Sequence, residues 1–216
     1  LGCGPRVLDS VSSGAGGGSS GKTRGFFAWL DAGSLPTQPI VIDFAHKFRG
    51  KLDRSAIIDE MTASVAVARA GGAETVGVNA EDGSRTDDGY LLEFALAAKE
   101  AGASRVRYCD TIGGDSPGRI RERFAKLASA IGIPVETHCH NDLGMAVANS
   151  VSGALGDLDA GQDAWINTCV NGIGERAGNA DLLSCILAFR YGFGISEPAA
   201  IGDPLARMLI GGAVTD

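Results

Sequence analysis

The stretch Pro134–Asp142, PVETHCHND, carries two of the three histidines of the chain and decides how the rest is interpreted. Its opening proline excludes a continuing helix, and an apolar run follows from Leu143, a pattern typical of a buried strand. Alternate side chains of a strand share one face, so His138 and His140 point to the same side and Cys139 points away. Such a pair can bind a metal ion. It can equally belong to a half-buried strand whose imidazoles only hydrogen-bond to their neighbours.

The composition is that of a globular protein. A chain of 216 residues with 44% hydrophobic and 21% charged residues can bury a sizeable core in one domain. The net charge of -7 argues against a nucleic-acid or anionic-membrane surface. We find no apolar run of 18 residues and no cationic leader, and we expect a cytoplasmic protein. The cysteines are odd in number and lack C-x-x-C spacing, which is typical of core residues in a reducing compartment: Cys3, Cys109, Cys139, Cys169 and Cys185.

Apolar periodicity predicts alternating strands and helices from residue 39 onward. The predicted strands are 40–44, 75–79, 104–109, 134–140 and 164–170, and the predicted helices are 54–70, 88–101, 117–131, 145–155 and 180–189. Helices of ten or more residues between strands are the crossovers that a parallel sheet requires. The pattern therefore predicts an α/β fold with five strand-helix units.

Polar residues gather directly after the predicted strands. Glu81 and Arg85 follow the second strand, Asp110 and Thr111 follow the third, and the segment 171–179 follows the fifth. Each of them alone could be an ordinary helix cap. Contributions from several successive strands favour the carboxyl face of a (β/α)8 TIM barrel, here a partial one, over the switch point of an open sheet.

We divide the chain into three parts. Residues 1–38 are rich in glycine and serine, and we expect them to be disordered or unrelated to the rest. Residues 39–195 form the partial barrel, and 196–216 are a C-terminal tail.

One motif in the first part offers a different function. Gly16–Thr23, GGGSSGKT, matches the phosphate-binding pattern G-x-x-x-x-G-K-[ST], with Ile40–Asp43 as a conceivable magnesium-binding strand. A tract this rich in glycine meets the pattern easily by chance, and Arg6–Val11 is a weak candidate for the preceding strand. A nucleotide-binding protein built on Lys22 is kept as an alternative.

The later motifs resemble a known family. HCHNDLGMAVAN from His138 and NTCVNGIGERAGNADL from Asn167 resemble the metal-dependent acyl-CoA condensing enzymes, namely homocitrate, isopropylmalate and citramalate synthases. The stretches 79–85, NAEDGSR, and 110–113, DTIG, are similar to two further motifs of that family. The resemblance covers roughly residues 51–193, and its wording is most similar to homocitrate synthases.

The resemblance implies an acyltransferase of carboxylic-acid and amino-acid biosynthesis that converts an acyl into an alkyl group on transfer. It would join acetyl-CoA to a 2-oxo acid, with 2-oxoglutarate favoured. Isopropylmalate or citramalate synthase is one alternative, and an acyl-CoA lyase on the same metal barrel is another.

The same resemblance implies the site. His138 and His140 would bind a divalent metal ion, with Asn179 in or near its coordination sphere, and zinc, manganese and magnesium all suit such ligands. The metal would hold the 2-oxo acid as a Lewis acid. Glu81 would help remove a proton from acetyl-CoA, which requires a pKa raised toward neutrality. Thr111 would hydrogen-bond the carboxylate of the oxo acid.

Four further residues have less specific assignments. Arg85 could pair with a substrate carboxylate in a bidentate way, or be an exposed residue at a helix start. His46 could match a family histidine. Arg176 and its neighbour Glu175 would form an internal ion pair or part of the acyl-CoA entrance.

Departures from the family pattern are equally informative. Residues 1–43 lack the L-R-D-G-E-Q motif that bears an arginine and an acidic metal ligand, and only five of eight barrel units are legible. We expect the chain to be a fragment that is inactive alone. The full-length protein would be a homodimer, or a complementing chain would carry the missing strands. Five open strands would expose two edges and part of an apolar barrel interior.

Overall fold

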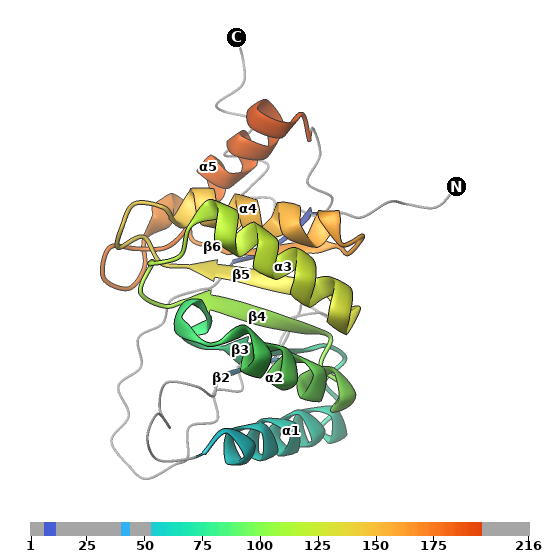
Figure 1. Ribbon diagram of the computed structural model, residues 1–216. Helices are drawn as coiled ribbons and strands as arrows, with labels where there is room; N and C mark the ends of the chain where they lie inside the picture. The colour runs from blue at the N-terminus through green and yellow to red at the C-terminus, as the bar shows by residue number, and fades with distance from the viewer. Residues whose placement is uncertain (1–6, 12–39, 44–52, 196–216) are drawn as a thin grey trace.

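The structure, a computed structural model, describes residues 7–11, 40–43 and 53–195, and its centre is one parallel sheet (Figure 1). Six strands lie in the order β1-β6-β5-β4-β3-β2, and every neighbouring pair is parallel. Their bounds are β1 Val7–Val11, β2 Ile40–Asp43, β3 Val76–Ala80, β4 Arg105–Asp110, β5 Val135–Cys139 and β6 Ala164–Thr168. A side-by-side parallel order from β2 to β6 requires a crossover after each strand.

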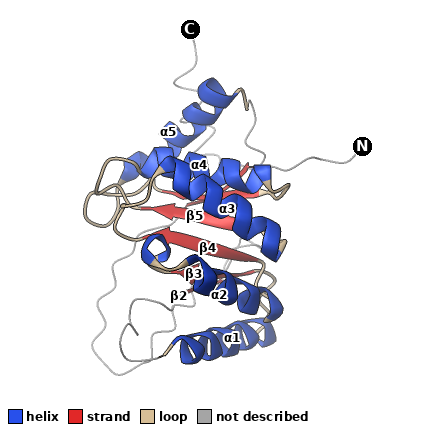
Figure 2. Cartoon of the chain, in the orientation of Figure 1, coloured by secondary structure: helices blue, strands red, loops and turns tan. Residues whose placement is uncertain are grey.

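Helices supply these crossovers and cover one face of the sheet (Figure 2). They are α1 Arg54–Ala70, α2 Asp88–Glu100, α3 Pro117–Ile131, α4 Ala146–Asp159 and α5 Leu182–Leu187. Short helical turns η1 Gly83–Arg85, η2 Val170–Gly172 and the π-helical η3 Ala188–Gly192 complete the series. Among the described helices, none has the length and apolarity needed to cross a bilayer. The predicted fold class, a partial (β/α)8 barrel, is confirmed.

Two differences from the predicted elements go beyond boundary shifts of one to four residues. The last helix begins at Leu182 because the Asp181 side chain accepts a hydrogen bond from the Ser184 amide and caps it, and it continues as a π-turn. The sheet also contains β1, which lies within residues 1–38 and pairs with β6. The predicted phosphate loop Gly16–Thr23, His46 and the tail 196–216 lie outside the described residues.

The core lies between the sheet and the helices. Tyr108 of β4 packs edge-on against Phe124 of α3, with ring centroids 5.3 Å apart. Two glycines let α4 approach closely, since a Cβ on Gly156 would lie 2.4 Å from the Arg121 carbonyl oxygen, and one on Gly153 would lie 2.5 Å from the Thr137 methyl. Tyr108 and Thr137 therefore face the helices.

The neighbours of these residues face the opposite side, which we call the inner face. It contains two rows in strand register, Arg107–Glu136–Trp165 and Cys109–His138–Asn167. The predicted apolar interior is wrong for β4, β5 and β6, where the described inner-face residues are mostly charged or polar. The reason is the alternation itself, since RVRYCD and VETHC put apolar residues under the helices and polar ones opposite.

A buried acid on α4 predicts a pH-dependent stability. Asp157 is fully buried; one carboxylate oxygen accepts from the Val135 amide at 3.2 Å, and the other has no partner. Burial raises its pKa well above the usual value. The unfolded chain then releases this proton at lower pH than the folded chain, so stability falls as pH rises from about 4 through the folded pKa, by at most about 1.4 kcal/mol per pH unit.

Asp157→Asn should remove that pH-dependent loss, which urea unfolding at pH 5 and pH 8 would measure. Asp159→Asn is the matched control, because Arg121 lowers the pKa of the exposed Asp159 and gives the opposite sign. Identical slopes for Asp157→Asn and the unchanged chain would contradict the prediction.

Candidate functional site

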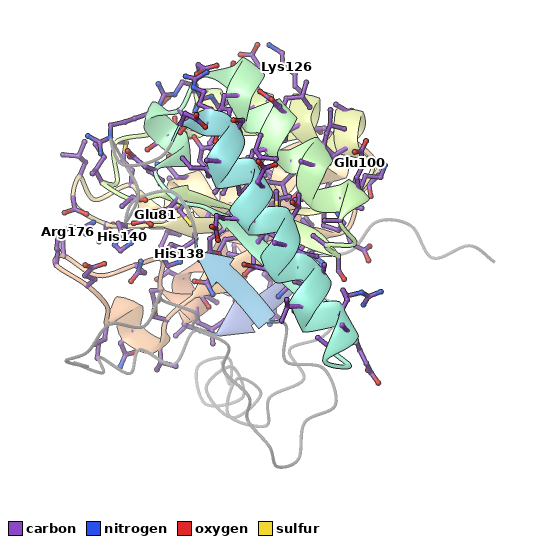
Figure 3. All side chains as sticks on the ribbon, turned by 90° about the horizontal axis from the view of Figure 1, so that it is seen from below. Glu81, Glu100, Lys126, His138, His140 and Arg176 are labelled. Carbon is purple, nitrogen blue, oxygen red and sulfur yellow. The ribbon has the colours of Figure 1, made fainter. Side chains whose placement is uncertain are left out.

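The predicted site residues lie at one end of the molecule. Figure 3 shows Glu81, His138, His140 and Arg176 on the same side, away from Glu100 at the end of α2. Glu81 follows β3, Thr111 follows β4, and the histidines end β5, so this side is the carboxyl edge of the strands. In a barrel of this kind, the carboxyl edge is where active sites form.

His138 is held in one tautomer. Its Nδ1 lies 2.5 Å from Oδ1 of Asn167, its partner in the neighbouring strand, and an amide oxygen can only accept. The Nδ1 therefore donates, and the lone pair of Nε2 stays available. Burial and, next, the charge of Arg107 lower the pKa of His138 to about 4, so the ring is neutral at pH 7.

His140 lies beside it, with ring centroids 5.0 Å apart and the rings nearly perpendicular. The residue is 5% exposed, and its Nδ1 is buried without a hydrogen-bond partner. Burial and the nearby Arg176 charge lower its pKa. Two neutral imidazoles thus stand together with lone pairs available.

Asn179 reaches the pair through the backbone. It forms a β-bridge with His140, and the Asn141 amide donates to the Gly178 carbonyl at 2.8 Å. The Asn179 side chain is buried, and its Nδ2 also lacks a partner. Three predicted metal ligands are therefore brought together.

Glycines make this close approach of loops feasible. Gly113 has φ +62°, and a Cβ there would lie 2.6 Å from the His140 carbonyl oxygen. Gly178 has φ +93°, and a Cβ would lie 2.1 Å from the Gly172 carbonyl oxygen. Side chains at either position would collide with backbone, so Gly113 lets the DTIG loop pack against the histidine loop and Gly178 lets the GERAGN loop fold back on itself.

Arg176 ties three loops together. Its guanidinium donates to both oxygens of Asp142, at 2.8 and 2.9 Å, and to the Thr111 carbonyl. The predicted pair with Glu175 is present at 3.6 Å, but the closer partner is Asp142, whose pKa Arg176 lowers. The loops after β4, β5 and β6 are thus fixed relative to one another.

Thr111 and Arg85 meet at Asp82. The Asp82 amide donates to the Thr111 hydroxyl oxygen at 2.8 Å, so the hydroxyl hydrogen is left to point elsewhere. Arg85 donates one hydrogen bond to each carboxylate oxygen of the buried Asp82, at 2.7 and 2.8 Å. Its bidentate pairing is thus directed at this chain's own carboxylate, and pairing with a substrate stays a prediction.

Glu81 lies next to that loop. It is half-buried and lines a small, mostly apolar pocket with Ile57, Tyr90 and Phe94 among its walls. Its predicted role in proton transfer stays a prediction.

Sequence reasoning missed Asn167 and the Arg176–Asp142 pair. The strand alternation could have placed Asn167 on the inner face, but its pairing with His138 depends on the register between strands.

The donor set fits a divalent metal ion, since neutral imidazole nitrogens and amide oxygens are metal ligands and the buried Nδ1 of His140 lacks a partner. Within the described ranges, no group of three His, Cys, Asp or Glu residues could hold an ion.

Comparison with known proteins finds similar synthases. The chain is 55% identical over 156 residues to a citrate (Re)-synthase of Dehalococcoides mccartyi, covering 72% of this chain and 38% of that protein. It is 42% identical over 162 residues to a 2-isopropylmalate synthase of Caldanaerobacter subterraneus, covering 75% and 40%, and 47% identical over 120 residues to a homocitrate synthase of Nostoc, covering 56% and 30%. The chain thus spans at most about two fifths of these relatives.

Among solved structures, hydroxymethylglutaryl-CoA lyase from Pseudomonas aeruginosa matches with a TM-score of 0.58 at 18% identity, covering 80% of this chain and 67% of that one. This likeness shows the fold. The HMGL-like family model matches residues 40–196, which include every predicted site residue. The chain therefore belongs to the HMGL-like family.

Proposed function

We propose that this chain is the central part of a synthase that condenses acetyl-CoA with a 2-oxo acid. The observation that carries the proposal is the His138–His140 pair, neutral, buried and fixed by Asn167 at the carboxyl edge of the sheet. The synthase names of three relatives, at 42 to 55% identity, support the reaction class.

His138, His140 and Asn179 would hold a zinc, manganese or magnesium ion, which when bound supplies Lewis acidity for a keto oxygen. The chain's own residues have separate tasks. Thr111 offers its hydroxyl hydrogen to the carboxylate of the oxo acid, because its oxygen already accepts from Asp82. Glu81 takes a proton from the methyl group of acetyl-CoA, directly or through water. Arg176 keeps the loops of Thr111 and His140 in register.

The 2-oxo acid substrate is 2-oxoglutarate or oxaloacetate. The motif wording favours 2-oxoglutarate, and the citrate (Re)-synthase relative favours oxaloacetate, whose condensation with acetyl-CoA gives citrate. Both are dicarboxylic.

A chimera tests the proposal directly. The aligned 156-residue segment of the Dehalococcoides mccartyi synthase would be replaced by that of this chain, and thiol release from acetyl-CoA measured with oxaloacetate, 2-oxoglutarate, pyruvate and 2-oxoisovalerate. We expect release with one of the dicarboxylic acids and none from the 216-residue chain alone, because its described residues supply only part of a (β/α)8 barrel.

The same chimera carrying His138→Ala is the control for background thioester hydrolysis. A soluble, folded chimera that releases no thiol with any of the four acids would overturn the proposed function. Release by the chain alone would overturn the expectation that further barrel strands are needed.

A further inference from the structure

We propose that Arg107 binds the second carboxylate of a dicarboxylic 2-oxo acid and so gives the site its preference for dicarboxylic over monocarboxylic acids. The inference rests on the proposed function, because it names the class of 2-oxo acid for the same site.

Among the described side chains of the inner face beside the histidines, arginines outnumber carboxylates. Arg107 donates from Nε and Nη2 to one oxygen of Glu136, at 3.0 and 2.6 Å, and Arg105 pairs with the other oxygen. Among the described residues, neither arginine has another carboxylate partner. Two guanidinium groups thus share one buried carboxylate, and buried charge without a counter-ion is costly.

Buried polar atoms at this place lack partners. Nη2 of Arg105, a residue 3% exposed, has no hydrogen bond, and neither has the buried side-chain oxygen of Asn79, the register partner of Arg107. The polar groups around Arg107 are thus incompletely satisfied within the described chain, a condition that native proteins rarely leave uncompensated.

Of the two arginines, Arg107 is the one that a ligand can reach. Arg105 stacks over the Trp165 ring, 4.3 Å from its centroid, and its side chain is 4% exposed. The Arg107 side chain is 12% exposed, and its Nη1 donates to none of the described residues. A free terminal nitrogen on a partly accessible guanidinium is what a carboxylate requires.

Arg107 also lies at the right depth. Cys109 is the register partner of His138, and Arg107 precedes it by two residues, roughly 7 Å along the strand on the same face. When the 2-oxo end of the acid is bound at His138 and Thr111, its second carboxylate can extend to the neighbouring row of the inner face, which contains Arg107.

Such a site distinguishes dicarboxylic from monocarboxylic 2-oxo acids. A monocarboxylic acid leaves the guanidinium without a partner in a desolvated site, whereas a dicarboxylic acid forms a charge-assisted hydrogen bond there.

The test measures binding by calorimetry to the chimera described above, loaded with Mn²⁺, using pyruvate, oxaloacetate and 2-oxoglutarate. We expect at least one dicarboxylic acid to bind about tenfold or more tighter than pyruvate, and Arg107→Asn to bring that ratio close to one. Arg107→Lys, which keeps the charge without the fork, should give an intermediate ratio. Arg121→Asn, an exposed arginine paired with Asp159, is the matched control and should keep the full ratio.

The possible failures are distinguishable. A ratio near one in the chimera without substitutions, or a ratio that survives Arg107→Asn, overturns this inference and leaves the proposed function standing. Binding of none of the three acids counts against the proposed function itself and takes the inference with it. If Arg107→Asn does not fold, the ratio measured for Arg107→Lys decides.

Discussion

His138→Ala is expected to weaken the binding of Mn²⁺ or Zn²⁺ to the chain by about 100-fold or more, since altering a residue that only supports a metal ligand typically costs 10- to 100-fold. The structural reason is specific to this ring. It is neutral because burial lowers its pKa to about 4, and Asn167 fixes the proton on Nδ1, so Nε2 is available at no protonation cost.

A graded series makes the result interpretable. Asn167→Ala leaves both imidazoles in place but removes the hydrogen bond that fixes the His138 tautomer. We expect metal affinity to fall by about 10- to 100-fold. Glu122→Gln is the control for adventitious binding, because this exposed glutamate on α3 pairs only with Lys126 nearby and lies apart from the site. Affinity would be read by calorimetry, and folding by circular dichroism.

If folded His138→Ala bound the ion as tightly as the unchanged chain, the histidine pair would be a hydrogen-bonded structural feature and the proposed chemistry would lose its basis. Equal losses in Glu122→Gln and His138→Ala would point to surface binding with the same consequence.

The sequence was sufficient for the fold because its signals are local. The alternation of apolar runs with helical segments predicted β2 to β6 to within two residues at their starts, and the parity of His138 and His140 predicted their shared face. The helix ends have local causes of the same kind, since Asp53 and Asp87 cap the starts of α1 and α2 and Gly132 ends α3.

Loop contacts were not predictable for a physical reason. Asp82 and Arg176 take left-handed conformations, φ +60° and +57°, which favour glycine; aspartate adopts them more readily than most residues, but arginine does not indicate them in advance. The Asp82 amide donates to Thr111 and the Arg176 guanidinium to Asp142 from these loops. Contacts of this kind depend on how separate loops meet, and one sequence does not encode that in any local pattern.

The composition of the inner face was predictable in part. The alternation in RVRYCD and VETHC could have shown that Arg105, Arg107 and Glu136 avoid the helices. Their pairing required the register Arg107↔Glu136, which is a property of two strands together. The prediction of an apolar interior was therefore wrong because it followed the general composition of barrels and not the alternation in these two strands.

Glu136→Ala is expected to destabilise the chain by about 3–5 kcal/mol, the usual result of breaking a buried ion pair from one side. Glu136 is fully buried and is the carboxylate that both Arg105 and Arg107 share. Removing it leaves two guanidinium groups in a poorly solvated interior, so most of the loss is the cost of unpaired charge. Urea unfolding monitored by circular dichroism measures it.

Two comparisons isolate that cause. Asp159→Ala removes an equally well formed but exposed pair with Arg121, and because water screens and solvates both groups we expect less than about 1 kcal/mol. Glu136→Gln keeps the shape and an oxygen acceptor but not the charge, so its effect should fall between the two. If Glu136→Ala cost no more than Asp159→Ala, the arginines would have to be neutralised from elsewhere. The charge imbalance that assigns a substrate carboxylate to Arg107 would then be absent.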